Sequence, residues 1–269
     1  MLYKSEDGNI SIGDTDMDYI AFGGGKKNFV IIPGLGDGLK TVKGTRLLLA
    51  RMYRDFGKDH RVYVFSRKNH IENGYSIRDM ARDQKIVMGI MGIKNAHLMG
   101  ISQGGMIAQY MAIDYPEIVD KLVLVVSSSR PNDIVRKVLE NWIDLAKGRN
   151  YGELMKDTME NFYTEERLNK MRKLYPIMTK VGKPKSFHRF IVQAEACLNH
   201  DAHGDLNKIN APTLIIGGQD DRIVGPDASA EMAREIKDSK LIVYGGLGHG
   251  AYEEAKDFNK IVLEFLSPA

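Results

Sequence analysis

Cysteine is nearly absent from this chain of 269 residues: Cys197 is the single one, so no disulfide can form within the chain. Long apolar runs are also missing, because stretches such as residues 122–126 are far too short to cross a bilayer. Neither charge dominates, since 38 Lys and Arg residues against 35 Asp and Glu residues leave a formal net charge of +3. Charges this nearly balanced argue against a dedicated nucleic-acid-binding protein.

The remaining composition is typical of a globular protein, with 43% hydrophobic and 27% charged residues. The length is sufficient for one large α/β domain with a substantial hydrophobic core. The N-terminal segment is polar and acidic, which is not typical of a signal peptide; its acidic residues are Glu6, Asp7, Asp14, Asp16 and Asp18. Together with the single thiol, these features predict a soluble, cytoplasmic protein.

Short apolar runs alternate along the chain with longer segments of helical period. Six runs predict buried strands, at residues 29–32, 62–65, 96–101, 122–126, 213–216 and 241–244. Helical patterns occupy residues 76–91, 103–115 and 251–266. This alternation predicts an α/β fold whose mainly parallel central sheet is flanked by helices.

The alternation is interrupted between residues 130 and 205, where amphipathic helical patterns replace the strands. One of them places apolar residues at spacings of three and four: Ile134, Val135, Val138, Leu139, Trp142, Ile143 and Ala146. We therefore expect a core domain of residues 1–129 and 206–269, with residues 130–205 inserted between two late strands as a helical lid.

Basic residues gather in one part of this expected lid. The stretch from Arg167 to Arg189 contains no Asp or Glu, and its basic positions are 167, 170, 172, 173, 180, 183, 185 and 189. Such a stretch suits an anionic substrate or an acidic lipid surface. A solvated face of surface helices is the simpler interpretation, and we favour it at this stage.

The most informative motif is Gly100-x-Ser102-x-Gly104, at the junction of an expected strand and an expected helix. A serine at such a corner has a strained backbone, and its hydroxyl projects above the end of the strand. The two glycines allow the strand and helix backbones to approach each other. The N–H of Gln103 begins the helix, where unpaired donors favour a developing oxyanion. Ser102 is therefore the candidate nucleophile.

With this motif the sequence resembles the α/β-hydrolase superfamily, specifically its lidded serine esterases and lipases, along nearly the whole chain. The resemblance implies an acid after a late strand and a histidine after the last strand. For the acid we prefer Asp221 to Asp220, because the following Arg-Ile-Val matches the usual continuation; Asp133 is an outside candidate. The implied histidine is His249, in a glycine-rich loop that precedes the last expected helix.

The resemblance also implies a second oxyanion donor, in the loop after an early strand. The backbone N–H of Leu35 would act there together with that of Gln103. Pro33 stands where this family commonly has histidine, which leaves the backbone donor intact but removes a usual support for the loop. The candidate pocket residues are Gly34, Gly36 and Trp142.

Three other patterns carry less weight. Gly34-x-Gly36-x-Gly38 does not have the spacing of a dinucleotide site, and residues 23–27 lack the Ser or Thr of a P-loop and predict a hairpin turn. A tight group of possible zinc ligands has no second ligand pair, so we expect it to lie in a surface loop; it comprises Cys197, His200, His203, Asp201 and Asp205. We expect no metal and no cofactor.

The resemblance implies a serine hydrolase that cleaves carboxylic esters through an acyl-enzyme on Ser102. Its expected partner is a small-molecule ester with an apolar acyl group, with neither nucleic acid nor stable membrane insertion involved; the oligomeric state stays open. The same triad also serves C–C bond hydrolases, lactonases, amidases and cofactor-free haloperoxidases. The basic stretch would favour the carboxylated substrate of a C–C bond hydrolase. A hydrolase-like binding protein with little turnover is the alternative from another class.

Overall fold

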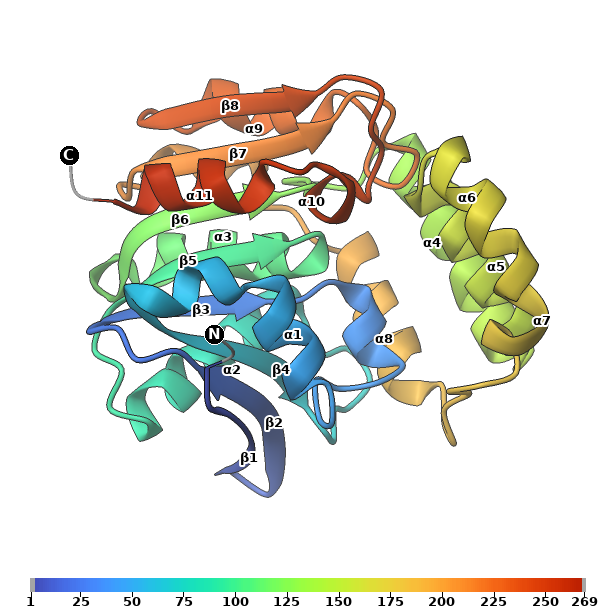
Figure 1. Cartoon of the computed structure of the whole chain (residues 1–269), viewed down its shortest axis with the longest axis horizontal. Helices are drawn as coiled ribbons and strands as arrows, with labels where there is room; N and C mark the ends of the chain where they lie inside the picture. The colour runs from blue at the N-terminus through green and yellow to red at the C-terminus, as the bar shows by residue number, and fades with distance from the viewer. Residues whose placement is uncertain (1–2, 268–269) are drawn as a thin grey trace.

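The computed structural model describes residues 3–267, at whose centre lies an eight-stranded sheet with helices on both faces (Figure 1). The strands are β1 (Ser5–Ile12), β2 (Thr15–Phe22), β3 (Lys27–Ile32), β4 (His60–Lys68), β5 (Ala96–Ile101), β6 (Val119–Val125), β7 (Thr213–Gly218) and β8 (Ser239–Tyr244). Their order across the sheet is β1-β2-β4-β3-β5-β6-β7-β8. β1 and β2 pair antiparallel, and β3 to β8 run parallel. The expected α/β fold with a mainly parallel sheet is confirmed.

Alternate residues of the central strands enter two separate apolar cores. In β3, Val30 and Ile32 face one core, whereas Phe29 and Ile31 face the other. Because both faces of β3, β5, β6 and β7 are covered, the sequences of these strands contain continuous apolar runs. The edge strand β8 is not buried as expected, since Leu241 and Val243 are exposed. Apart from the helices α4 to α8 between β6 and β7, the helices are α1 (Arg46–Met52), α2 (Ile77–Ile90), α3 (Gln103–Asp114), α9 (Ala228–Glu235), α10 (Ala251–Glu254) and α11 (Phe258–Leu266). Short 3-10 turns are η1 (Leu35–Gly38), η2 (Arg54–Lys58), η3 (Pro116–Ile118) and η5 (His203–Lys208).

Between β6 and β7 the described chain contains helices joined by loops and no strand, and we refer to residues 130–205 as the helical insertion. Its elements are α4 (Asp133–Lys147), α5 (Tyr151–Phe162), α6 (Glu165–Met171), η4 (Arg172–Leu174), α7 (Tyr175–Met178) and α8 (His188–Leu198). Figure 1 shows α4 to α7 beyond the carboxyl ends of the parallel strands, with α8 between them and the sheet. α8 packs against both α4 and η1. No helix within residues 3–267 combines the length and the apolar character needed to cross a membrane.

Three other sequence expectations need correction. The two strands β1 and β2 were not predicted, because they form a half-exposed antiparallel pair whose sequences contain no continuous apolar run. Residues 23–27 do not form a hairpin turn, since the strands on either side, β2 and β3, each pair with β4. The helix expected over residues 251–266 is interrupted at residues 255–257, because Ala255 adopts an extended conformation that ends α10.

Candidate active site

Ser102 lies at the sharp corner between β5 and α3. Its φ of 53° and ψ of −118° are strained for a residue with a side chain. The flanking glycines make this corner possible: a Cβ on Gly100 would overlap the carbonyl of Gly104, and a Cβ on Gly104 would overlap the carbonyl of Ile32. The sequence therefore folds locally so that Ser102 is presented at the carboxyl edge of the sheet.

His249 and Asp221 form a buried pair in two loops of the same edge. His249 Nδ1 lies 2.8 Å from Asp221 Oδ2, and each residue is 3% exposed. The other carboxylate oxygen, Oδ1, accepts hydrogen bonds from the N–H groups of Ile223 (2.8 Å) and Val224 (2.9 Å). Since an ionised carboxylate only accepts hydrogen bonds, this pair assigns the proton to Nδ1 and leaves Nε2 of a neutral imidazole free to accept one.

The other two candidate acids, Asp220 and Asp133, do not hydrogen-bond to His249 within residues 3–267. Asp220 is exposed, although it directly precedes Asp221. Asp133 is exposed as well, at the first turn of α4. Within residues 3–267, the carboxylate that hydrogen-bonds to His249 is that of Asp221.

Two backbone N–H groups begin helical turns beside Ser102. Leu35 is the first residue of η1, and Gln103 is the first residue of α3. The first N–H groups of a helix have no acceptor within it, so both are unpaired donors of the helix start. Gly34 brings the two turns together, since a Cβ there would lie 3.3 Å from Ser102 Cβ. Donors in this place suit an oxyanion that forms next to the serine.

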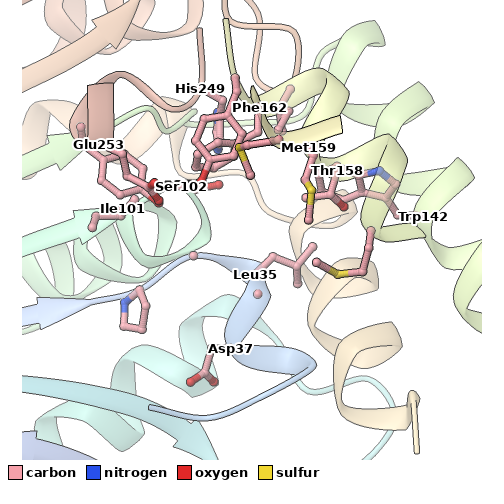
Figure 2. Close-up of a pocket in the computed structure, with 18 of the residues that line it drawn as sticks. Leu35, Asp37, Ile101, Ser102, Trp142, Thr158, Met159, Phe162, His249 and Glu253 are labelled. Atoms are coloured by element: carbon pink, nitrogen blue, oxygen red, sulfur yellow. Dashed lines mark hydrogen bonds between the residues drawn. The ribbon is translucent and has the colours of Figure 1, made fainter. Parts of the chain in front are cut away.

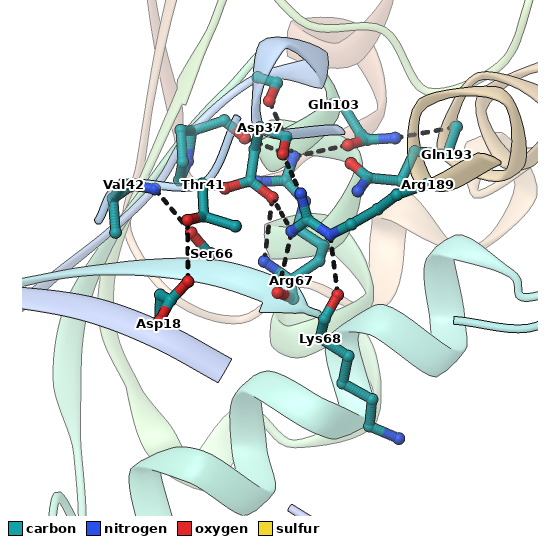
Figure 3. A network of polar contacts seen from close by, with 12 residues as sticks. Asp18, Asp37, Thr41, Val42, Ser66, Arg67, Lys68, Gln103, Arg189 and Gln193 are labelled. Atoms are coloured by element: carbon teal, nitrogen blue, oxygen red, sulfur yellow. Dashed lines mark hydrogen bonds and ion pairs between the residues drawn. The ribbon is translucent and has the colours of Figure 1, made fainter. Parts of the chain in front are cut away.

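The loop that carries Leu35 rests on a buried arginine that the sequence analysis missed (Figure 3). Arg67, at 1% exposure, donates through Nη2 to the carbonyls of Pro33 (2.6 Å) and Gly34 (3.1 Å), and to Gln103 Oε1. Burial lowers its pKa to about 10. Arg67 thus supports the loop in which proline replaces the family's usual histidine, and it joins the segments of both candidate oxyanion donors.

Asp37 supplies the negative charge of this network. Its Oδ2 accepts hydrogen bonds from the backbone N–H of Arg67 at 3.1 Å and from Arg189 Nη2. Arg189 belongs to α8, and it also donates to the carbonyls of Arg67 (2.9 Å) and Lys68 (2.8 Å). The helical insertion is therefore bound directly to the loop beside Ser102. The signal in the sequence was a cation, Arg67, two residues after the apolar run 62–65.

A cavity of about 490 Å³ opens onto Ser102 and His249 (Figure 2). Gly34, Gly36 and Trp142, the three candidate pocket residues, line it. Most of its wall is apolar: Leu35, Ile101, Trp142, Met155, Met159, Phe162, Met171, Met178 and Ile223. The lining residues of the described chain include no Lys or Arg.

The wall residues that were not predicted from the sequence include Phe162, Tyr163 and Glu253. Glu253 Oε2 accepts hydrogen bonds from Tyr163 Oη at 2.8 Å and from Arg167 Nη2 at 3.2 Å. Burial raises the pKa of Glu253. These contacts join the insertion to α10 across about 90 residues of sequence, so no local pattern could reveal them.

The possible zinc ligands were expected in a surface loop, and this expectation is wrong for two of them. Cys197 and His200 are both buried at 2% exposure, because the end of α8 packs onto the core. The Cys197 thiol accepts a hydrogen bond from Gln103 Nε2 at 3.2 Å, whereas His200 packs edge-on against Tyr110. In the described part of the chain, no three His, Cys, Asp or Glu side chains come close enough to hold a metal ion.

Comparison with known proteins identifies the family of the chain. The sequence model of the alpha/beta hydrolase fold family matches residues 27–256, and the chain belongs to this family of hydrolases. It is 30% identical over 226 residues to the AB hydrolase superfamily protein YisY of Bacillus subtilis (strain 168), covering 80% of this chain and 82% of that protein. It is 32% identical over 198 residues to a 2-hydroxy-6-oxononadienedioate/2-hydroxy-6-oxononatrienedioate hydrolase of Pseudomonas sp, covering 70% and 68%.

A solved structure shows the same fold over nearly the full length. MGS-M2, an alpha/beta hydrolase enzyme from a Medee basin deep-sea metagenome library, superposes with a TM-score of 0.88. The superposition covers 97% of this chain and 98% of that one, at 21% sequence identity.

Proposed function

We propose that the protein is a serine esterase in which Ser102, His249 and Asp221 form the catalytic triad. The observation that carries the proposal is the convergence of three segments at one cavity. Ser102, which has a strained backbone, and the buried His249 both line the cavity, and Asp221 is hydrogen-bonded to Nδ1 of the His249 imidazole. This arrangement provides a nucleophile, a base and a group that orients the base.

The proposed reaction begins when His249 Nε2 takes the proton of the Ser102 hydroxyl and Oγ attacks the ester carbonyl carbon. The carbonyl oxygen becomes an oxyanion, which the N–H groups of Leu35 and Gln103 stabilise by about 3 kcal/mol each in the transition state. His249 then gives the proton to the departing alcohol. Water, activated by the same imidazole, attacks the acyl-enzyme and releases the acid. No step needs a metal or an organic cofactor.

The lining of the cavity supports a neutral ester with an apolar acyl group as the substrate. Methionine and aromatic side chains of the insertion form much of the wall, and such side chains bury apolar groups. We interpret residues 130–205 as a lid over a core of residues 1–129 and 206–269, because α4, α5, α6 and α7 each contribute to this wall. The single free thiol, which is buried, supports a reducing compartment such as the cytoplasm.

C–C bond hydrolysis is the second candidate, and the Pseudomonas relative favours it, since its name designates a hydrolase of dicarboxylates. Carboxylates in a buried site need cationic partners. The wall of this cavity offers no Lys or Arg side chain within the described residues, and the nearby Arg167 is paired with Glu253. An uncharged ester therefore suits the cavity better than a dianion.

The test is a comparison of kcat/KM for p-nitrophenyl esters of increasing acyl length with that for 2-hydroxy-6-oxononadienedioate. We expect an optimum among short to medium acyl chains, and we expect Ser102→Ala to reduce kcat at least about 10⁴-fold. Faster cleavage of the dioate than of every ester would establish the second candidate instead. Labelling of Ser102 by a fluorophosphonate without turnover of any substrate would indicate a binding protein.

A further inference from the structure

The helical insertion exposes three large apolar side chains at its outer end. Leu174, Ile177 and Val181 are 51%, 64% and 66% exposed. They follow one another at spacings of three and four, and Val181 N–H donates to the Ile177 carbonyl at 3.1 Å, so the helical path continues past α7. We call residues 172–185 the lid tip; Figure 1 shows its helix, α7, at the right-hand edge of the molecule, at one end of the insertion.

Lysines lie beside these apolar residues in the sequence of the lid tip. Lys173, Lys180, Lys183 and Lys185 are exposed, and none forms an ion pair with another described residue. Acidic residues are absent from positions 167 to 189. Arg172 differs from the lysines, because Glu160 and Glu165 neutralise it. The lid tip therefore presents four unneutralised positive charges beside exposed apolar side chains.

The lid tip and the residue before it also contribute to the cavity wall. Met178, at the end of α7, lines the cavity together with Met171, which ends α6. Ile177, the neighbour of Met178, is exposed to solvent. The same segment therefore contributes both to the apolar surface group and to the wall of the cavity that contains Ser102. A partner that covered the lid tip would lie against the outer wall of the cavity.

We propose that the lid tip docks on the surface of an anionic lipid bilayer, and that the cavity receives its apolar esters from there. Apolar side chains enter the headgroup region while surrounding lysines contact the lipid phosphates, which is the physical pattern of an interfacial segment. The charge of the lid tip complements an anionic surface, and its protruding position permits contact without movement of the core. The delivery of esters rests on the proposed function, whereas the docking does not.

Docking is tested by sedimentation of the full-length protein with lipid vesicles. We expect binding to vesicles of phosphatidylcholine mixed with phosphatidylglycerol, none to phosphatidylcholine alone, and weaker binding as salt rises. Lys180→Glu combined with Lys183→Glu should reduce the partition coefficient at least about tenfold, because each lysine near an anionic surface contributes about fivefold. Ile177→Ser should reduce it about tenfold, through the loss of apolar contact.

Two matched controls separate docking from general effects. Lys237→Glu combined with Lys240→Glu makes the same change of net charge beside and within β8. Leu47→Ser removes an apolar side chain that is 66% exposed on α1. Both controls should leave vesicle binding within about twofold of the wild type, because neither changes a residue of the lid tip. Charges far from the bilayer are screened by salt.

Several results would overturn the docking proposal. These are absence of binding to both kinds of vesicle, equal losses in the lid-tip and control variants, and Ile177-dependent self-association in analytical ultracentrifugation without vesicle binding. Hydrolysis of a water-soluble short-chain ester, measured for every variant, reports on an intact site and should be unchanged. If the protein bound vesicles but cleaved no ester, the docking proposal would stand and only the proposed function would be wrong.

Discussion

The ring of Phe162 packs edge-on against the imidazole of His249, with centroids 5.5 Å apart and an interplanar angle of 71°. Phe162 ends α5 of the helical insertion, and its carbonyl also accepts a hydrogen bond from Gly250 N–H at 2.8 Å. The insertion thus holds both the side chain of His249 and the loop that carries it. The helix α5 therefore lines the cavity and also positions His249, the proposed base.

Phe162→Ala should lower kcat for a soluble ester by about tenfold to a hundredfold, with a smaller change in KM. The reason is that the imidazole loses its packing partner, and a small misplacement of a catalytic group is costly. Steady-state kinetics measure the split between kcat and KM. Phe162→Leu, which restores apolar contact, should recover part of kcat; an unchanged kcat in the alanine variant would show that the ring does not position His249.

Asp221→Asn should lower kcat about 10⁴-fold, because an amide in this place no longer stabilises the imidazolium or fixes the tautomer of His249. Asp220→Asn is the matched control, since it makes the same chemical change at the exposed neighbouring position. It should leave kcat within a few-fold of the wild type. If the two variants lost activity equally, the assignment of Asp221 would be wrong.

Asp37→Asn should lower the free energy of unfolding by about 3 kcal/mol, because it leaves the buried Arg67 without its anionic partner. We also expect a lower kcat, since the same network supports the loop of Leu35. Denaturant unfolding and ester hydrolysis measure the two effects. The control is Asp7→Asn at the more exposed pair with Arg46, where the expected change is below about 1 kcal/mol.

His200 should make the protein less stable as the pH falls from about 6.5 to about 4. Burial lowers its pKa from 6.5 to about 4 in the folded state, so the unfolded chain takes up the proton first. Its stabilising effect is present above pH 6.5 and is lost as the pH falls through this window, by up to about 3 kcal/mol. His200→Phe should flatten that part of the curve of unfolding free energy against pH. Parallel curves for the two proteins would contradict this account.

The class of fold was predictable because its central strands are short, continuously apolar runs separated by helical patterns. The strained corner at Ser102 was visible too, since only small residues fit at Gly100 and Gly104. These are local requirements, and local requirements leave a pattern in the sequence. β1 and β2, whose half-exposed residues mix polar and apolar types, left no such pattern.

Contacts between distant segments account for most of what the sequence did not predict. Arg67, Asp37 and Arg189 meet only because η1, β4 and α8 converge. The interruption after α10 has a similar origin: Thr164 of the insertion donates to Glu254 at 2.6 Å, while Asp257 accepts a hydrogen bond from Tyr244 at 3.1 Å. Periodicity alone predicts a continuous helix there, because it contains no information about these partners.

The burial of Cys197 gives the protein an intrinsic reporter of its own opening. Burial raises the pKa of this thiol to about 12, so at neutral pH it is protonated and unreactive. It lies on α8, against Gln103 of the core. A thiol-specific dye would therefore react only when α8 separates from the core, and the labelling rate would measure the frequency of that event. With one cysteine in the chain, the signal would have a single source and need no engineered label.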